Sequence, residues 1–242
     1  MDRALLRRFP SIGERLPWVP LGAFPTPVHR IEGLGVPDLW VKRDDLSGEL
    51  YGGNKVRKLE LALARARRRG ADRLWVHGAL GSNWVVACLV YGQPMGFAVD
   101  AMLFESPLTE HARRNFAITR SRADRLEVWR SVLGVPIAAA LHAARGGGRT
   151  EYLPPGGSGA LSSIGYADAA LELSEQVARG EAPCPSHVWV AHGSGGTAAG
   201  LLAGFALLEW PTRVCAVQVN ETVIANRWVV LALARRTLTL LE

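Results

Sequence analysis

The sequence predicts an α/β fold of mostly parallel, open sheets with helices on both faces. Short apolar runs with a period of two alternate with longer segments that have the spacing of helices. A connection between parallel strands needs a crossover, usually a helix, so this alternation is typical of parallel sheets. In such sheets ligands bind at the carboxyl ends of the strands. Three loops rich in glycine and hydroxyl residues are therefore the candidate functional segments.

The predicted strands are apolar runs bounded by turn residues. They lie at residues 38–43, 73–78, 99–104, 125–130, 150–155, 187–192 and 213–219. The predicted helices have apolar residues three and four positions apart, and they cover residues 55–69, 83–91, 108–117, 133–145, 162–179, 197–209 and 222–240. Strand and helix therefore alternate along most of the chain from residue 38 onward.

Composition excludes several classes of protein. With 242 residues and 48% hydrophobic content, the chain is long enough for one large domain or two smaller ones. No apolar run approaches the length of a membrane span, and the first residues lack the apolar centre of a signal peptide. We therefore expect a cytoplasmic protein with no membrane partner. Cys88, Cys184 and Cys215 have neither disulfide nor metal-ligand spacing, so no metal site is expected.

The net charge of +6 raises the question of nucleic-acid binding. The densest basic run, RARRRG at residues 65–70, closes a predicted helix. Arginines suit the negative end of a helix dipole, and glycine suits the stop that follows. A solvated helix end explains the run better than a binding patch, so no nucleic-acid partner is expected.

The loop GSGGTAAG, residues 193–200, has the features of a phosphate cup. It follows a predicted strand and opens a helix, whose free N–H groups bind anions, and Ser194 and Thr197 add hydroxyl donors. No lysine follows the glycines, which argues against a nucleoside-triphosphate loop. A turn that is rich in glycine only for packing remains an alternative. Gly193, Gly195 and Ala198 also satisfy a loose dinucleotide pattern, with Glu221 as the ribose-binding acid, so a nicotinamide-dependent oxidoreductase stays open.

Two further loops have a structural explanation of their own. In GALGSNWV, residues 78–85, Ser82 or Asn83 can cap the helix that follows. In PPGGSGALSSIGY, residues 154–166, Ser162 or Ser163 can do the same. Neither loop indicates a site when it is taken alone.

The use of lysine singles out Lys55. Of the 28 basic residues 25 are arginine, and the lysines are Lys42, Lys55 and Lys58. Lys55 follows two glycines at the start of a predicted helix, where the positive dipole end disfavours a cation and lowers the pKa of an amine. A neutral amine can attack a carbonyl, which would give Lys55 a chemical role. For a single lysine, however, an exposed surface position is the commoner explanation. An amine next to a glycine turn, together with a separate phosphate cup, is what pyridoxal phosphate requires.

Four motifs in register carry a resemblance to a known family. VKRDDLSGELYGGNKVRKLE, GALGSNW, PPGGSGALSSIGY and GSGGTAAG resemble the D-cysteine desulfhydrase and 1-aminocyclopropane-1-carboxylate (ACC) deaminase family in order and approximate spacing. The family belongs to the tryptophan synthase β-like, fold-type II class, and the resemblance runs from about Phe9 to the end of the chain. It implies a pyridoxal 5′-phosphate-dependent lyase or deaminase that acts on a small amino acid, in a homodimer.

The resemblance also implies a role for each matching residue. Lys55 would form the Schiff base and move protons at the substrate carbon, and Ser82 would meet the substrate carboxylate or assist proton transfer. Asn83 would hydrogen-bond the ring oxygen of the cofactor. Its phosphate would be held by Lys58 with Gly193, Ser194, Gly195, Gly196 and Thr197. The family architecture implies a larger cofactor domain, residues 1–57 with 156–242, and a smaller substrate-side domain, residues 58–155.

The sequence departs from the family pattern in two places. Trp84 stands where the family usually has a polar residue, which implies an altered substrate pocket. The chain ends at Glu242, whereas the family continues through a segment that carries the group facing the pyridine nitrogen. We therefore expect a C-terminally truncated member. A non-catalytic remnant that binds the cofactor, or only a partner, is the alternative to an active enzyme.

Overall fold

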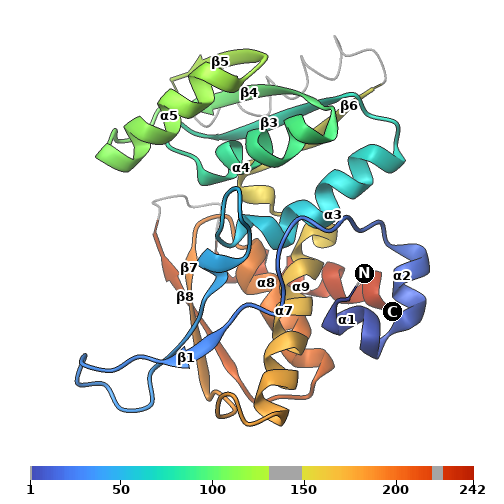
Figure 1. Cartoon of the computed structure of the whole chain (residues 1–242), viewed down its shortest axis with the longest axis vertical. Coiled ribbons are helices and arrows are strands. Elements are labelled where there is room, and N and C mark those ends of the chain that lie inside the picture. The colour runs from blue at the N-terminus through green and yellow to red at the C-terminus, as the bar shows by residue number, and fades with distance from the viewer. Residues whose placement is uncertain (1, 131–148, 220–225) are drawn as a thin grey trace. The chain divides into compact units, whose positions relative to one another are not determined.

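The computed structural model describes residues 2–130, 149–219 and 226–242, which form two compact units (Figure 1). The first unit contains Met1–Leu61 and Ser158–Glu242, and the second contains Ala62–Gly157. The predicted helix at 133–145 and the acid Glu221 lie outside the described residues. Within the described part of the chain, no helix is both long and apolar enough to cross a membrane.

The first unit combines helices with two small sheets. Its helices are α1 (Ala4–Arg8), α2 (Pro10–Arg15), η1 (Asp44–Leu46), the first half of α3 (Lys55–Arg68), α7 (Ala160–Ala178), α8 (Gly196–Leu207) and α9 (Arg227–Leu241). Strands β1 (Val28–Arg30) and β2 (Trp40–Lys42) pair antiparallel, and β7 (His187–His192) pairs with β8 (Arg213–Gln218) in parallel. The β7–β8 sheet packs on the helices, because Val190 of β7 contacts one apolar cluster formed by α7 and α8 and a second formed by α8 and α9.

Helix α7 is the centre of this unit. It packs against α1, α8 and α9 (Figure 1). Most of its side chains are buried. Small residues permit the close approach of α8, because a β-carbon on Gly200 would lie 2.2 Å from the carbonyl oxygen of Ser163. The small-residue spacing of GTAAGLLAG therefore serves helix packing as well as the loop that precedes it.

The second unit is a four-stranded parallel sheet with helices. Its strands β3 (Arg73–Ala79), β4 (Ala98–Phe104), β5 (Arg125–Trp129) and β6 (Thr150–Leu153) lie in the order β5-β4-β3-β6. The central strands β3 and β4 are buried along most of their length, whereas the edge strand β5 is largely exposed. The remaining elements are the second half of α3, α4 (Asn83–Gly92), η2 (Gln93–Met95), α5 (Glu110–Arg122) and η4 (Pro155–Gly157).

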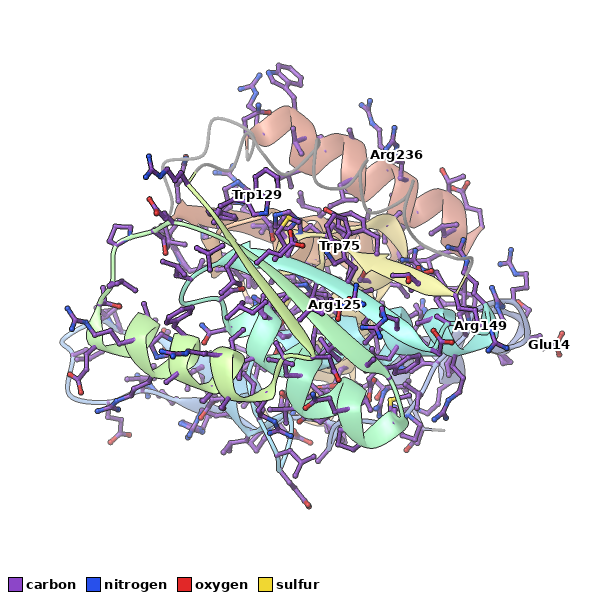
Figure 2. All side chains as sticks on the ribbon, turned by 90° about the horizontal axis from the view of Figure 1, so that it is seen from above. Glu14, Trp75, Arg125, Trp129, Arg149 and Arg236 are labelled. Atoms are coloured by element: carbon purple, nitrogen blue, oxygen red, sulfur yellow. The ribbon has the colours of Figure 1, made fainter. Side chains whose placement is uncertain are left out.

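Alternation along β3 divides its side chains between the two faces of this sheet. Leu74 lies under Gly92 of α4, and α5 packs in turn on α4. Trp75, the next residue, points to the other face and packs with Met102 and Trp129 (Figure 2). Both faces of the central strands are therefore apolar, which is why their sequences are almost continuously hydrophobic.

The predicted fold class is confirmed, and every predicted strand is present. Helix α5 ends at Arg122 rather than near residue 117, and α1, α2 and β1 were not predicted. The predicted caps Ser162 and Ser163 were wrong, because α7 begins at Ala160 with Gly159 as its N-cap. The elements α1, α2 and β1 are short, and α7 begins without a capping side chain, so their sequence signals are weak.

A buried arginine fixes the first turn of α3. The Arg57 guanidinium, which is 1% exposed, donates to both carboxylates of Asp44 and Glu172 at 2.8–3.2 Å. It also stacks 4.1 Å from the ring centroid of Phe24. Burial alone would raise the pKa of Asp44 and of Glu172, but the charge of Arg57 and the hydrogen bonds to each carboxylate together outweigh it, so both pKa values are lowered. The network therefore remains ionised at neutral pH.

One turn later, Glu60 ties the N-terminal segment to the same helix. Its carboxylate accepts hydrogen bonds from the side chains of Arg3 and Trp18 and from the backbone N–H groups of Leu21 and Gly22. A buried carboxylate with this many donors is well compensated. The segment before β1 is therefore anchored to α3 by polar contacts as well as by apolar packing.

Asp168 of α7 is a buried acid that accepts a hydrogen bond from the backbone N–H of Leu5 at 2.8 Å. Burial raises the pKa of this carboxyl from 3.8 to about 6. Because its pKa is higher in the folded protein than in the unfolded chain, the carboxyl favours folding most below pH 3.8. That contribution is lost as the pH rises through 6.

Replacing Asp168 with asparagine keeps the acceptor for Leu5 and removes the ionisation. We expect Asp168→Asn to raise the free energy of unfolding by about 1–3 kcal/mol at pH 8, and by little at pH 4. Urea denaturation of both proteins across this pH range measures the difference. A gain that does not depend on pH would contradict the account.

Candidate functional site

Two glycines shape the turn that leads into α3. A β-carbon on Gly52 would lie 1.8 Å from the carbonyl oxygen of Asp45, so no larger residue fits there. Gly53 has φ +108°, which side chains rarely adopt, and its carbonyl oxygen accepts a hydrogen bond from the Ser47 hydroxyl at 2.9 Å. The turn therefore delivers Lys55 to the first position of the helix, as the sequence predicted.

Lys55 is connected through its neighbour to the start of α8. The Nζ atom of Lys55 donates to Oδ1 of Asn54 at 2.8 Å. The Nδ2 atom of Asn54 donates in turn to Oγ1 of Thr197 at 3.3 Å. The two motifs that the sequence singled out, around residues 55 and 197, thus meet within the first unit.

Lys58 lies one turn further along α3 and is 1% exposed. Its Nζ atom would be 3.0 Å from a β-carbon on Gly196, so the ammonium lies against the first turn of α8. Burial and the neighbouring Lys55 charge lower the pKa of Lys58 well below 10.5. An anion bound here would offset both effects, because it would compensate the buried charge and screen the two amines.

The start of α8 adds backbone and hydroxyl groups. Gly195 has φ +83° and is the N-cap, so the helix begins at Gly196. The N–H of Gly196 donates to Oγ of Ser158 at 3.1 Å, and the Ser158 hydroxyl donates to Oγ of Ser194 at 2.7 Å. Gly193 lies in the same loop, directly after β7.

Ser158 is a residue of the candidate site that the sequence analysis missed. It lies in PPGGSGALSSIGY, where a single hydroxyl among glycines looks like an ordinary loop residue. Only the pairing with Ser194 and Gly196 reveals its place. The available signal was that this loop, like residues 193–200, combines glycines with a hydroxyl just before a helix.

The donor set fits a phosphate group next to a reactive carbonyl. Two lysine amines, a helix N-terminus and hydroxyl groups converge within the first unit, where a β-carbon on Gly196 would crowd Oγ of Ser158 and Nζ of Lys58. Phosphate is a dianion that prefers such N–H and O–H donors. Among the described residues no cluster of histidine, cysteine and acidic side chains could hold a metal ion.

Ser82 and Asn83 belong to the second unit and are described there by themselves. Ser82 is the N-cap of α4, and its Oγ atom accepts from the backbone N–H of Val85 at 3.3 Å. Asn83 is exposed at the first position of the helix. Its Oδ1 atom accepts from Nδ2 of Asn115 at 2.8 Å and lies 2.9 Å from Nε2 of His111.

Trp84, the departure from the family pattern, is almost completely buried in the second unit. Its indole ring lies over Gly157, where a β-carbon would approach the ring to 2.5 Å. Gly157 has φ +65° and closes η4, so the absence of a side chain there serves both the turn and the tryptophan. Trp84 therefore packs α4 against the glycine loop at 154–157.

Comparison with known proteins identifies the same class of enzyme as the motifs. Residues 19–235 match the family described as pyridoxal-phosphate dependent enzyme. The chain is 36% identical over 216 residues to the nocardicin C-9′ epimerase of Nocardia uniformis subsp. tsuyamanensis, covering 84% of this chain and 64% of that protein. It is 32% identical over 229 residues to the D-cysteine desulfhydrase of Salmonella paratyphi A, covering 90% and 69%.

A solved structure agrees with these relatives. The crystal structure of an ACC deaminase homologue matches with a TM-score of 0.82 and 26% identity, over 100% of this chain and 73% of that chain. The resemblance drawn from the motifs is therefore confirmed. The chain spans 64% to 73% of the length of these three proteins.

The burial of Lys58 predicts opposite effects on stability and on anion binding. We expect Lys58→Met to raise the free energy of unfolding of the ligand-free protein by about 1 kcal/mol, because a methionine is buried at no electrostatic cost. The same substitution should abolish the rise in melting temperature that inorganic phosphate gives the wild type. Thermal denaturation with and without phosphate measures both effects.

Lys42 provides the matched control. Its Nζ atom contacts Oε1 of Glu172 at 2.5 Å and Oε1 of Gln176 at 2.6 Å, so it is a structural lysine. Lys42→Met should lower stability by about 1–3 kcal/mol and leave the phosphate effect intact. A phosphate effect that survives in Lys58→Met would contradict the assignment of the anion site.

Proposed function

Because the chain belongs to the pyridoxal-phosphate-dependent enzyme family, we propose that it is a lyase or deaminase that acts on a small amino acid. The proposal rests on the position of Lys55 and Lys58 at the first turn of α8. Lys55 is linked to Thr197 through Asn54, and Lys58 lies against Gly196. One amine would react with a carbonyl, and the other would hold an anion. The relatives named D-cysteine desulfhydrase and ACC deaminase homologue support this substrate class.

The phosphate of the cofactor would be held by Lys58 and the α8 loop. Its donors would be Nζ of Lys58, the backbone of Gly193–Gly196 and the hydroxyls of Ser158, Ser194 and Thr197. Lys55 would hold the cofactor aldehyde through Nζ. Asn54 is within hydrogen-bond distance of that amine and orients it.

The remaining roles concern the substrate. When bound, pyridoxal phosphate withdraws electrons from the α-carbon of an amino acid and so makes its proton easier to remove. Lys55 Nζ would take and return that proton, since a neutral amine is a suitable base. Ser82 would contact the substrate carboxylate or assist proton transfer, and Asn83 would contact the cofactor ring. For D-cysteine and one water the products are pyruvate, ammonia and hydrogen sulfide.

An epimerase is a second candidate. The relative that is 36% identical is named an epimerase, and epimerisation also begins with proton removal at a carbon next to an amine. The difference is that the proton returns to the opposite face and no group leaves. Proton exchange in heavy water without release of ammonia, sulfide or keto acid would favour this function over the lyase.

The Lys55→Ala variant tests the proposed function. Wild-type protein with pyridoxal phosphate should absorb in the visible range, lose that absorbance on borohydride reduction, and release ammonia from D-cysteine or ACC. Lys55→Ala should lack the reducible absorbance, and its turnover should fall by at least about a thousandfold. Bound cofactor with neither product release nor α-proton exchange, across small D- and L-amino acids, would instead indicate a non-catalytic cofactor-binding protein.

A further inference from the structure

Helix α5 approaches the loop before α4 unusually closely. A β-carbon on Gly81 would lie 2.4 Å from the β-carbon of Ala112, so only glycine permits this approach. His111 and Asn115 flank Ala112 on α5, four residues apart and therefore on one face of the helix. The approach places both side chains beside Asn83.

The hydrogen-bond partners of the Asn115 amide allow only one orientation of its nitrogen and oxygen. Its Nδ2 atom lies 3.0 Å from the carbonyl oxygen of Gly81, which can only accept a hydrogen bond. The nitrogen, not the oxygen, must therefore face the loop. The second hydrogen of the same nitrogen points to Asn83 at 2.8 Å, so Asn83 must present its oxygen there.

His111 completes the arrangement. Its Nε2 atom lies 2.9 Å from Oδ1 of Asn83 and 3.1 Å from Nδ2 of Asn115. Because both hydrogens of Nδ2 are already directed to oxygen atoms, the imidazole donates its Nε2 hydrogen to Oδ1 of Asn83. Two donors thus hold the oxygen of Asn83 toward α5 and turn its N–H₂ edge the other way.

We propose that Asn115 and His111 are positioning residues that present the N–H₂ group of Asn83 as a donor to the ring oxygen of pyridoxal phosphate. This inference rests on the proposed function, because it assumes that Asn83 contacts the cofactor. Two donors on one carbonyl oxygen also polarise an amide and strengthen its N–H groups as donors. Asn115 and His111 therefore set both the direction and the strength of the contact.

The test compares two ligands in several variants. Asn115→Asp replaces the relaying N–H₂ group with a carboxylate, which attracts the N–H₂ group of Asn83 and turns its oxygen toward the cofactor. We expect Asn115→Asp to bind pyridoxal phosphate about tenfold more weakly and to shift its visible absorbance. Binding of an analogue that lacks the ring hydroxyl should change less than twofold.

His111 provides an independent pair of variants. His111→Leu removes a donor and should weaken the binding of pyridoxal phosphate several-fold, but not that of the analogue. His111→Gln carries a side-chain N–H₂ in place of the imidazole N–H and should restore binding. Thr119→Val, one turn along α5 from Asn115, is the control for disturbance of the helix and should bind both ligands as the wild type does.

The outcomes separate this inference from the proposed function. Wild-type protein that does not bind pyridoxal phosphate would overturn both. Wild-type binding, with equal losses for the two ligands in the Asn115 and His111 variants, would show a merely structural role and overturn the inference alone. A loss confined to the ligand with the ring hydroxyl, and its rescue by His111→Gln, would support it.

Discussion

The buried Arg57 guanidinium is the interaction on which the candidate site depends. It joins α3 to η1 through Asp44 and to α7 through Glu172. Removing one partner of such a buried network typically costs about 3–5 kcal/mol, because a charge is left uncompensated. Lys55 and Lys58 lie on the same two turns of α3, so this network fixes where both amines are held.

The basic side chains of the first unit lie in two kinds of environment. Arg57 is paired with the carboxylates of Asp44 and Glu172, Lys42 is paired with that of Glu172, and these contacts stabilise the fold. Lys55 and Lys58 instead lie near each other and near the start of α8, and burial together with the Lys55 charge lowers the pKa of Lys58. Such an arrangement sacrifices some stability of the ligand-free protein, which is typical of a binding site.

The sequence predicted the strands because their apolar pattern is almost uninterrupted. It predicted the position of Lys55 at the start of a helix because the glycine turn and the helix start are local signals. It did not predict the burial of Arg57, because an arginine beside the apolar positions of a helix looks like a solvated residue. Ser158 was missed for a similar reason, since its partners are 36 and 38 residues away. The contacts of His111 and Asn115 with Asn83 could not be predicted, because they depend on the approach of α5 to Gly81. Contacts between segments far apart in the sequence determine the places of Arg57, Ser158, His111 and Asn115.

The central claim is that the two neighbouring lysines have different tasks, and peptide mapping tests it most directly. The protein is incubated with one equivalent of pyridoxal phosphate, reduced with borohydride, digested and examined by mass spectrometry. The account predicts the pyridoxyl group on Lys55 and none on Lys58, which lies at the anion site. A pyridoxyl group on Lys58, with Lys55 unmodified, would contradict it.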